Sequence, residues 1–127
     1  MTTVTQEPES FIPLTPAVFH ILLALADGEK HGYAIMQEVE AISHDQIKMG
    51  PGTLYGSIKR MIANGLIEEV DERPDLNLDD QRRRYYQLTG LGSAVLSAEA
   101  QRLAALLERA RAKQVMAIRQ LAIIIVP

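Results

Sequence analysis

The chain has 127 residues, 47% of them apolar, and a formal net charge of -3 at neutral pH. This length and apolar content predict one domain with a modest core. The absence of cysteine excludes disulfides, thiol nucleophiles and thiolate metal sites, and it fits a reducing cytoplasm.

Residues 1–13 are predicted to form a disordered leader. The segment opens with MTTVTQEPES, which is polar and acidic and has neither the basic flank nor the apolar run of a secretory signal. The longest purely apolar run, LAIIIV at residues 121–126, falls far short of the roughly 20 residues that a membrane-spanning helix needs. We therefore expect a soluble, cytoplasmic protein with no membrane partner.

Two short helices are predicted next. Thr15 can cap the first with its hydroxyl, Pro16 suits the first helical turn, and Gly28 ends the pattern. The second helix is expected to start near His31. Apolar side chains recur at three- and four-residue spacings in both helices, at Phe19, Leu22, Leu23 and Ala26 and then at Ile35, Val39 and Ile42.

A third helix is predicted in GPGTLYGSIKRMIANG, residues 50–65. Gly50 and Pro51 form its start, and Asn64 and Gly65 form its end. The preceding residues 46–49 are too short for a helix and are expected to form a small strand or an extended linker. The inward stripe of the helix consists of Leu54, Ile58, Met61 and Ile62.

A β-hairpin is predicted after the third helix. The runs LIEEV (66–70) and RRYYQL (83–88) have strand composition, and the polar segment between them contains Pro74 and Asn77. Residues 14–88 are therefore expected to form one small domain.

A long helix is predicted from Thr89 onward, because no further proline occurs before Pro127. Its apolar positions alternate spacings of four and three, a heptad pattern typical of helix–helix packing. We expect residues 89–127 to form a dimerisation helix and an apolar tail, since a two-fold dimer is the commonest assembly that buries such a stripe. The alternative is a helix folded back on its own domain. The residues assigned to the subunit interface are Leu96, Leu103, Leu107, Ala110 and Leu121.

Charge is unevenly distributed along the chain. Residues 46–67 carry Lys48, Lys59 and Arg60 and no acidic residue, whereas residues 68–80 are strongly acidic and a run of three arginines follows. Because salt screens electric fields over about 8 to 10 Å, these local patches matter more for binding than the net charge does.

Three helices followed by a hairpin is the order of a winged helix-turn-helix, in which the third helix enters the DNA major groove. We therefore predict a mainly α fold with a small β-hairpin and a long C-terminal helix. Opposite the inward stripe of the third helix lie Thr53, Ser57 and Arg60, with Tyr55 and Lys59 at the flanks. Hydroxyl, amine and guanidinium groups donate to phosphates and base edges, so this face is expected to contact DNA.

Four linked motifs closely resemble the PadR family of bacterial transcriptional regulators. They are HGYAI at 31–35, GPGTLYGSIKRM at 50–61, NGLI at 64–67 and RRRYYQLTGLG at 82–92. The resemblance implies a winged-helix domain with a dimerising C-terminal helix. It also implies a repressor that a small-molecule effector or another signal releases from a two-fold DNA operator.

The resemblance further implies roles for individual residues in binding DNA. Tyr55 and Lys59 match recognition-helix positions. His31 and Tyr33 match the start of the family's second helix, which lies near the DNA backbone. The hairpin corresponds to the wing of the fold. Arg82, Arg83 and Arg84 match the positively charged base of that wing.

Two features depart from the family's pattern. The wing insert DERPDLNLDD is acidic, so we expect the arginines at its base to contact DNA rather than its tip. The chain has no tryptophan, which excludes an effector pocket built on paired tryptophans.

Since the three histidines are isolated in sequence, we expect no enzymatic activity, metal site or cofactor. The alternative function is a winged-helix protein–protein interaction module without DNA binding.

Overall fold

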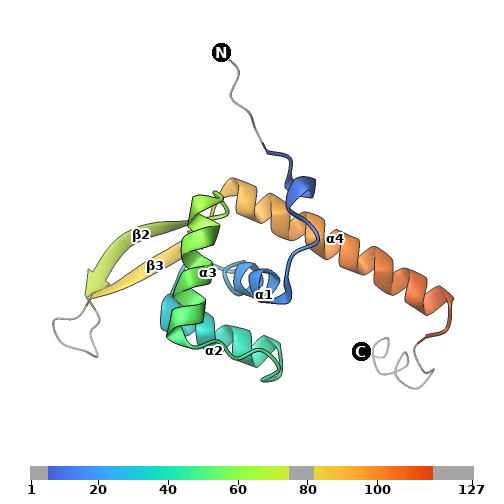
Figure 1. Cartoon of the computed structure of the whole chain (residues 1–127), viewed down its shortest axis with the longest axis horizontal. Helices are drawn as coiled ribbons and strands as arrows, with labels where there is room; N and C mark the ends of the chain where they lie inside the picture. The colour runs from blue at the N-terminus through green and yellow to red at the C-terminus, as the bar shows by residue number, and fades with distance from the viewer. Residues whose placement is uncertain (1–5, 75–81, 116–127) are drawn as a thin grey trace, which may run out of the picture.

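The computed structural model describes residues 6–74 and 82–115. Three short helices pack together beside a small antiparallel sheet, and a fourth helix crosses this body and extends beyond it (Figure 1). The predicted mainly α fold with a hairpin is confirmed. The elements in chain order are the 3-10 turn η1 (Pro8–Phe11), α1 (Pro16–Ala24), β1 (Lys30–His31), α2 (Gly32–Ile42), α3 (Pro51–Ala63), β2 (Ile67–Pro74), β3 (Arg82–Leu88) and α4 (Gly90–Ala112).

The predicted capping residues set the helix boundaries. The Thr15 hydroxyl oxygen accepts a hydrogen bond from the Val18 amide at 3.3 Å, and the Thr89 hydroxyl oxygen accepts one from the Gly92 amide at 2.9 Å. At the end of α3, Gly65 has a φ of 78°, a left-handed conformation that glycine adopts without a steric penalty. The chain thereby turns directly from α3 into β2.

The sheet has three strands in the order β1-β3-β2, all antiparallel. The hairpin of β2 and β3 was predicted, whereas β1 was not, because two residues are too few to show an alternating pattern. In the register, Lys30 lies opposite Tyr86 and His31 lies opposite Tyr85. Residues 46–49 form no strand, so the extended linker was the right alternative.

One hydrophobic core joins all four α-helices to the base of the hairpin. Two residues predicted to face inward, Leu23 and Ile62, are instead 41% and 38% exposed. At about 100° per residue, Leu23 projects from the side of α1 opposite its buried residues, and Ile62 lies at the edge of the buried stripe of α3. The fully buried side chains include Ile21, Leu22, Ile35, Val39, Leu54, Ile58, Met61, Ile67 and Val95.

The segment before α1 is structured from Pro8 onward, so the predicted disordered leader over residues 1–13 is wrong for this part. Residues 8–11 form η1, and Phe11 and Ile12 pack partly buried against the core. We refer to residues 8–15 as the strap, because this segment crosses α4 before entering α1 (Figure 1). Residues 1–5 lie outside the described residues.

The first half of α4 packs on its own domain. Val95 is fully buried in the core, and Leu96 packs partly buried against it. Leu96, which was assigned to the subunit interface, thus contacts the core of its own domain while staying partly exposed, and its place in an interface stays a prediction. The alternative of a helix folded back on its domain holds for this half.

The second half of α4 is shorter than predicted. The helix ends at Ala112, and Gln114 has a φ of 58°, which interrupts the expected heptad path. Leu103 and Leu107 are exposed, and Ala110 is partly buried. Leu121 and the tail LAIIIVP lie outside the described residues.

Candidate nucleic-acid interface

Helix α3 turns one side to the core and the other to solvent. The buried side chains of Leu54, Ile58 and Met61 hold it in place. The opposite side exposes Thr53, Tyr55, Lys59 and Arg60, as predicted, and α3 contains no acidic residue. An exposed helix face with hydroxyl and basic groups can donate hydrogen bonds to phosphates and base edges.

Ser57 was predicted on this exposed face, and that placement is wrong. It is only 4% exposed, and its hydroxyl oxygen accepts a hydrogen bond from Nη2 of Arg60 at 3.2 Å. Ser57 follows Leu54 by three residues and precedes Met61 by four, so helical geometry places it over the inward stripe. Its visible role is to hold the Arg60 guanidinium along α3.

Tyr55 connects α3 to the start of α2. A Cβ atom added to the buried Gly32 would overlap the Tyr55 hydroxyl oxygen and ring. Tyr55 nevertheless remains 45% exposed, so it belongs to both the α2–α3 contact and the outer face. The glycine of the HGY motif is therefore explained by the approach of α3, a relation that a single sequence does not reveal.

His31 caps α2 and packs against the wing. Its Nδ1 accepts a hydrogen bond from the Ala34 amide at 3.2 Å, which in a neutral ring leaves the proton on Nε2. The ring also meets Tyr85 of β3 edge to face, with centroids 5.5 Å apart. Next to the buried Gly32, Tyr33 is 53% exposed. The start of α2 thus lies beside β3 and offers Tyr33 to solvent.

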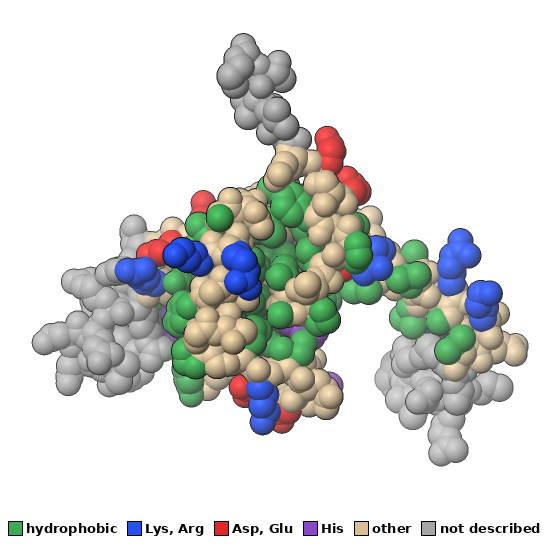
Figure 2. Space-filling model, in the orientation of Figure 1, with side chains coloured by type: hydrophobic (Ala, Val, Ile, Leu, Met, Phe, Trp, Pro, Cys, Tyr) green, Lys and Arg blue, Asp and Glu red, His purple; other side chains and the backbone are tan. Residues whose placement is uncertain are grey.

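The base of the hairpin adds basic groups beside α3. The Arg84 side chain is exposed and lies 3.7 Å from Oε2 of Glu69 on β2. Arg82 and Arg83 are placed only by their register, opposite Pro74 and Arg73. Figure 2 shows basic side chains gathered over α3 and the adjoining base of the hairpin. The acidic insert between the strands lies largely outside the described residues.

Burial raises the pKa of Tyr86 on β3, and the nearby Glu69 carboxylate raises it further. Tyr86 therefore stays neutral and contributes no negative charge near the basic groups. Glu69 is an acidic neighbour of Arg84 at this site, and an exposed pair of this kind contributes little to stability.

The described residues contain no group of three or more histidine, aspartate or glutamate side chains arranged to hold a metal ion. Within the same residues, no helix combines the length and apolarity that a membrane span requires.

Comparison with known proteins identifies the family. Residues 21–98 match the family model described as the transcriptional regulator PadR-like family. The chain belongs to this family. The PadR-like match covers α2, α3, the hairpin and the buried start of α4.

Two curated proteins illustrate the relationship of this PadR-like chain to others. It is 38% identical over 86 residues to an uncharacterised 37.1 kDa protein in transposon TN4556 of Streptomyces fradiae, covering 68% of this chain and 22% of that protein. It is 38% identical over 78 residues to transcriptional regulator Rv3488 of Mycobacterium tuberculosis, covering 61% of this chain and 66% of that regulator. The chain thus spans less than two thirds of either relative.

Solved structures share the fold of the PadR-like chain. A PadR-like transcriptional regulator from Bacillus cereus has a TM-score of 0.65 at 19% identity, over 80% of this chain and 93% of that one. Bacillus subtilis PadR in complex with operator DNA has a TM-score of 0.58 at 21% identity, over 68% of this chain and 47% of that one. At these identities the likeness establishes the winged-helix fold.

Proposed function

We propose that this PadR-like chain is a sequence-specific DNA-binding transcriptional regulator whose α3 enters the major groove. The observation that carries the proposal is the acid-free outer face of α3, held rigidly by a buried apolar stripe. Lys59 suits a phosphate, and Arg60 suits either a phosphate or a guanine edge. Thr53 and Tyr55 add hydroxyl donors on the same face.

The start of α2 and the base of the wing flank this helix and are proposed to contact the DNA backbone. Tyr33 is exposed at the start of α2, and Arg84 is exposed at the base of the wing. Arg82 and Arg83 extend the basic run along β3. His31 supports this surface by joining α2 to β3 through its cap and its ring contact with Tyr85. Phosphate contacts of this kind position a recognition helix without specifying sequence.

We further propose a homodimer formed through the second half of α4. This half extends beyond the body of the domain (Figure 1). Leu103, Leu106 and Leu107 are 38%, 51% and 45% exposed, although a monomer gains nothing from presenting such a stripe to water. A two-fold dimer would bury these leucines and place two copies of α3 on half-sites about one helical turn of DNA apart. Repression of the bound promoter, relieved by a signal, is the mode we expect.

Selection of genomic DNA fragments by the purified full chain, followed by sequencing, tests the proposal. Enrichment of an inverted-repeat sequence supports a dimeric, sequence-specific regulator. Enrichment of a single half-site retains DNA recognition and removes the two-fold arrangement. If no fragment is enriched even at low salt, the proposal fails and a protein-contact role becomes the better account.

A further inference from the structure

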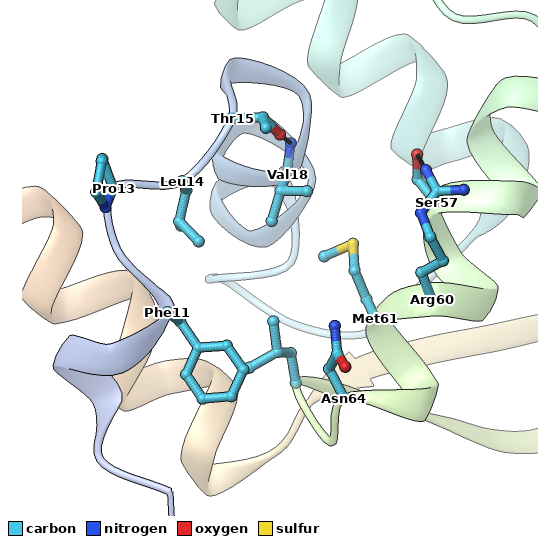
Figure 3. Close-up of a pocket in the computed structure, with 10 residues that line it drawn as sticks. Phe11, Pro13, Leu14, Thr15, Val18, Ser57, Arg60, Met61 and Asn64 are labelled. Carbon is cyan, nitrogen blue, oxygen red and sulfur yellow. Dashed lines mark hydrogen bonds between the residues drawn. The ribbon is translucent and has the colours of Figure 1, made fainter.

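The guanidinium of Arg60 is held by a neighbouring serine on α3. Its Nη2 donates a hydrogen bond to the buried Ser57 hydroxyl oxygen at 3.2 Å, and Figure 3 shows the side chain running back along α3 to that contact. Nη1 lies 3.7 Å from the position that a Cβ atom on Gly56 would occupy. The guanidinium therefore lies beside Gly56 and Ser57, about 5 Å closer to the N-terminus of α3 than its own Cα.

No acidic side chain in the described part of the chain neutralises this guanidinium. Arg84, Arg102 and Arg111 each lie beside a glutamate, whereas Arg60 forms no ion pair with a described carboxylate. A cavity of about 230 Å³ lies between α3 and the strap and borders Arg60, and none of the described residues that line it is acidic. The neutral hydroxyl thus orients the guanidinium and leaves its positive charge for a ligand.

Ser57 is a rigid anchor, because it belongs to the buried side of α3. The neighbouring Leu54 and Ile58 are packed in the core, and Ser57 is buried with them. The long Arg60 side chain bends back to this fixed hydroxyl. An arginine loses rotamer freedom when a ligand fixes it, so a side chain that is fixed in advance binds at a lower ordering cost.

The held geometry suits a guanine edge better than a phosphate. Most of the guanidinium N–H donors remain after the bond to Ser57, and a pair from Nη1 and Nη2 can reach O6 and N7 of a guanine together. A phosphate needs no fixed fork, and the adjacent, exposed Lys59 offers a flexible ammonium for it. In helix-turn-helix proteins the N-terminal part of the recognition helix meets base edges, and the Arg60 guanidinium is turned toward that part of α3.

We propose that Ser57 is a positioning residue that holds the Arg60 guanidinium in place to bind O6 and N7 of a guanine in the major groove. This inference rests on the proposed function and deepens it, because it names the base that α3 reads at one position of its DNA site. Specificity at that base pair depends on a buried serine that itself touches no DNA. Loss of the hydroxyl leaves the arginine charge in place and removes only its orientation.

The hold on Arg60 is tested without DNA by the NMR order parameter of its Nε–H group in the full chain. Ser57→Ala should lower this order parameter, and Ser97→Ala should not. Ser97 is a matched control, because its exposed hydroxyl oxygen accepts a hydrogen bond from Nε2 of Gln101 at 3.2 Å on α4. An equal order parameter in wild type and Ser57→Ala would overturn the role of Ser57.

Base specificity is measured on the selected DNA and on versions in which each base pair is replaced in turn. At one G·C pair the wild type should discriminate by about tenfold or more, and Arg60→Lys should lose this discrimination because an ammonium keeps the charge without the fork. Ser57→Ala should reduce it at the same pair by about threefold to tenfold with an unchanged salt dependence. Ser57→Thr keeps the hydroxyl and should retain the discrimination, as should Ser97→Ala.

The outcomes separate this inference from the proposed function. An equal loss of affinity at every base pair in Ser57→Ala and Arg60→Lys, or unchanged discrimination in both, would overturn the guanine contact while DNA binding stands. If the wild type selects no DNA, the proposed function fails and the guanine contact fails with it, whatever the order parameter of Arg60.

Discussion

The phenol ring of Tyr55 lies so close to the backbone of Gly32 that a Cβ atom there would overlap its hydroxyl oxygen. This contact joins the first turn of α2 to the outer side of α3. It explains why the HGY and TLYG segments belong together, since α3 is placed partly by a glycine outside it. The angle between α2 and α3 therefore depends on the absence of a side chain at position 32.

Gly32→Ala should lower the free energy of unfolding by about 1 to 3 kcal/mol, the usual cost of forcing a methyl group into a packed contact. In a Tyr55→Ala background the added methyl group meets no ring, so the same change should cost little. Denaturant unfolding of the two single variants and the double variant measures the interaction free energy between positions 32 and 55. Equal costs in both backgrounds would show that the contact does not constrain the helices.

Gly56→Ala separates stability from DNA affinity. The nearest atom to a Cβ at this position is Nη1 of Arg60 at 3.7 Å, which is an ordinary contact. Alanine should therefore raise the unfolding free energy by up to about 1 kcal/mol through its better helix propensity. We expect weaker binding to the selected DNA, because the methyl group stands on the face that approaches it. Wild-type affinity in this variant would show that DNA does not come close to Gly56.

Glu99 should stabilise the attachment of α4 to the strap. Replacement by alanine leaves the partly buried Leu14 amide without its acceptor, so the unfolding free energy should fall by about 1 to 3 kcal/mol. Glu108 provides a matched control, because it pairs with Arg111 three residues later at 2.6 Å but is exposed. Glu108→Ala should change stability by less than about 0.5 kcal/mol. Similar losses in both variants would contradict the role given to burial.

The same residue predicts a pH dependence. The hydrogen bond from Arg102 lowers the pKa of Glu99, and the Leu14 amide acts in the same direction, against the opposing effect of burial. A lowered folded-state pKa means that Glu99 contributes stability above its unfolded pKa and loses it as pH falls through the folded value. The stability gap between wild type and Glu99→Gln should therefore narrow on acidification. A gap independent of pH would contradict this.

Leu103→Asp and Leu107→Asp should separate the subunits, because each places a charge within the leucine stripe proposed as the interface. Ala105→Asp is the control, since it lies on the other side of α4 from both leucines by helical geometry. Solution mass at several concentrations gives the oligomeric state of all four proteins. A monomeric wild-type chain, or an unchanged mass in both leucine variants, would contradict the proposed dimer.

Local signals in the sequence predicted the helices and the hairpin. Thr15 and Thr89 start helices by accepting hydrogen bonds from amides three residues later, and Gly65 ends α3 through its left-handed backbone, so their effects are local and readable from sequence. Ser57 was misplaced because its environment depends on how α3 sits on the core. Periodicity indicates a buried face without saying which partner covers it.

The strap and Glu99 were missed for a related reason. A single carboxylate within a helix usually faces water, and Glu99 is buried only because the Leu14 amide and Arg102 surround it. Glu99 stands four residues after the buried Val95 and three before a basic partner, the one sequence signal that could have suggested its position. The cavity beside the strap could not be foreseen, because segments distant in sequence form it.

The central claim is that the outer face of α3 binds DNA, and the salt dependence of affinity for the selected DNA tests it most directly. For the wild-type chain, the logarithm of the binding constant should fall linearly with the logarithm of salt concentration. Lys59→Ala should weaken binding and flatten this slope by about one if the lysine neutralises one phosphate. Arg60→Ala should cost about 1 to 3 kcal/mol if the arginine reads a base. Wild-type affinity and slope in both variants would contradict the account.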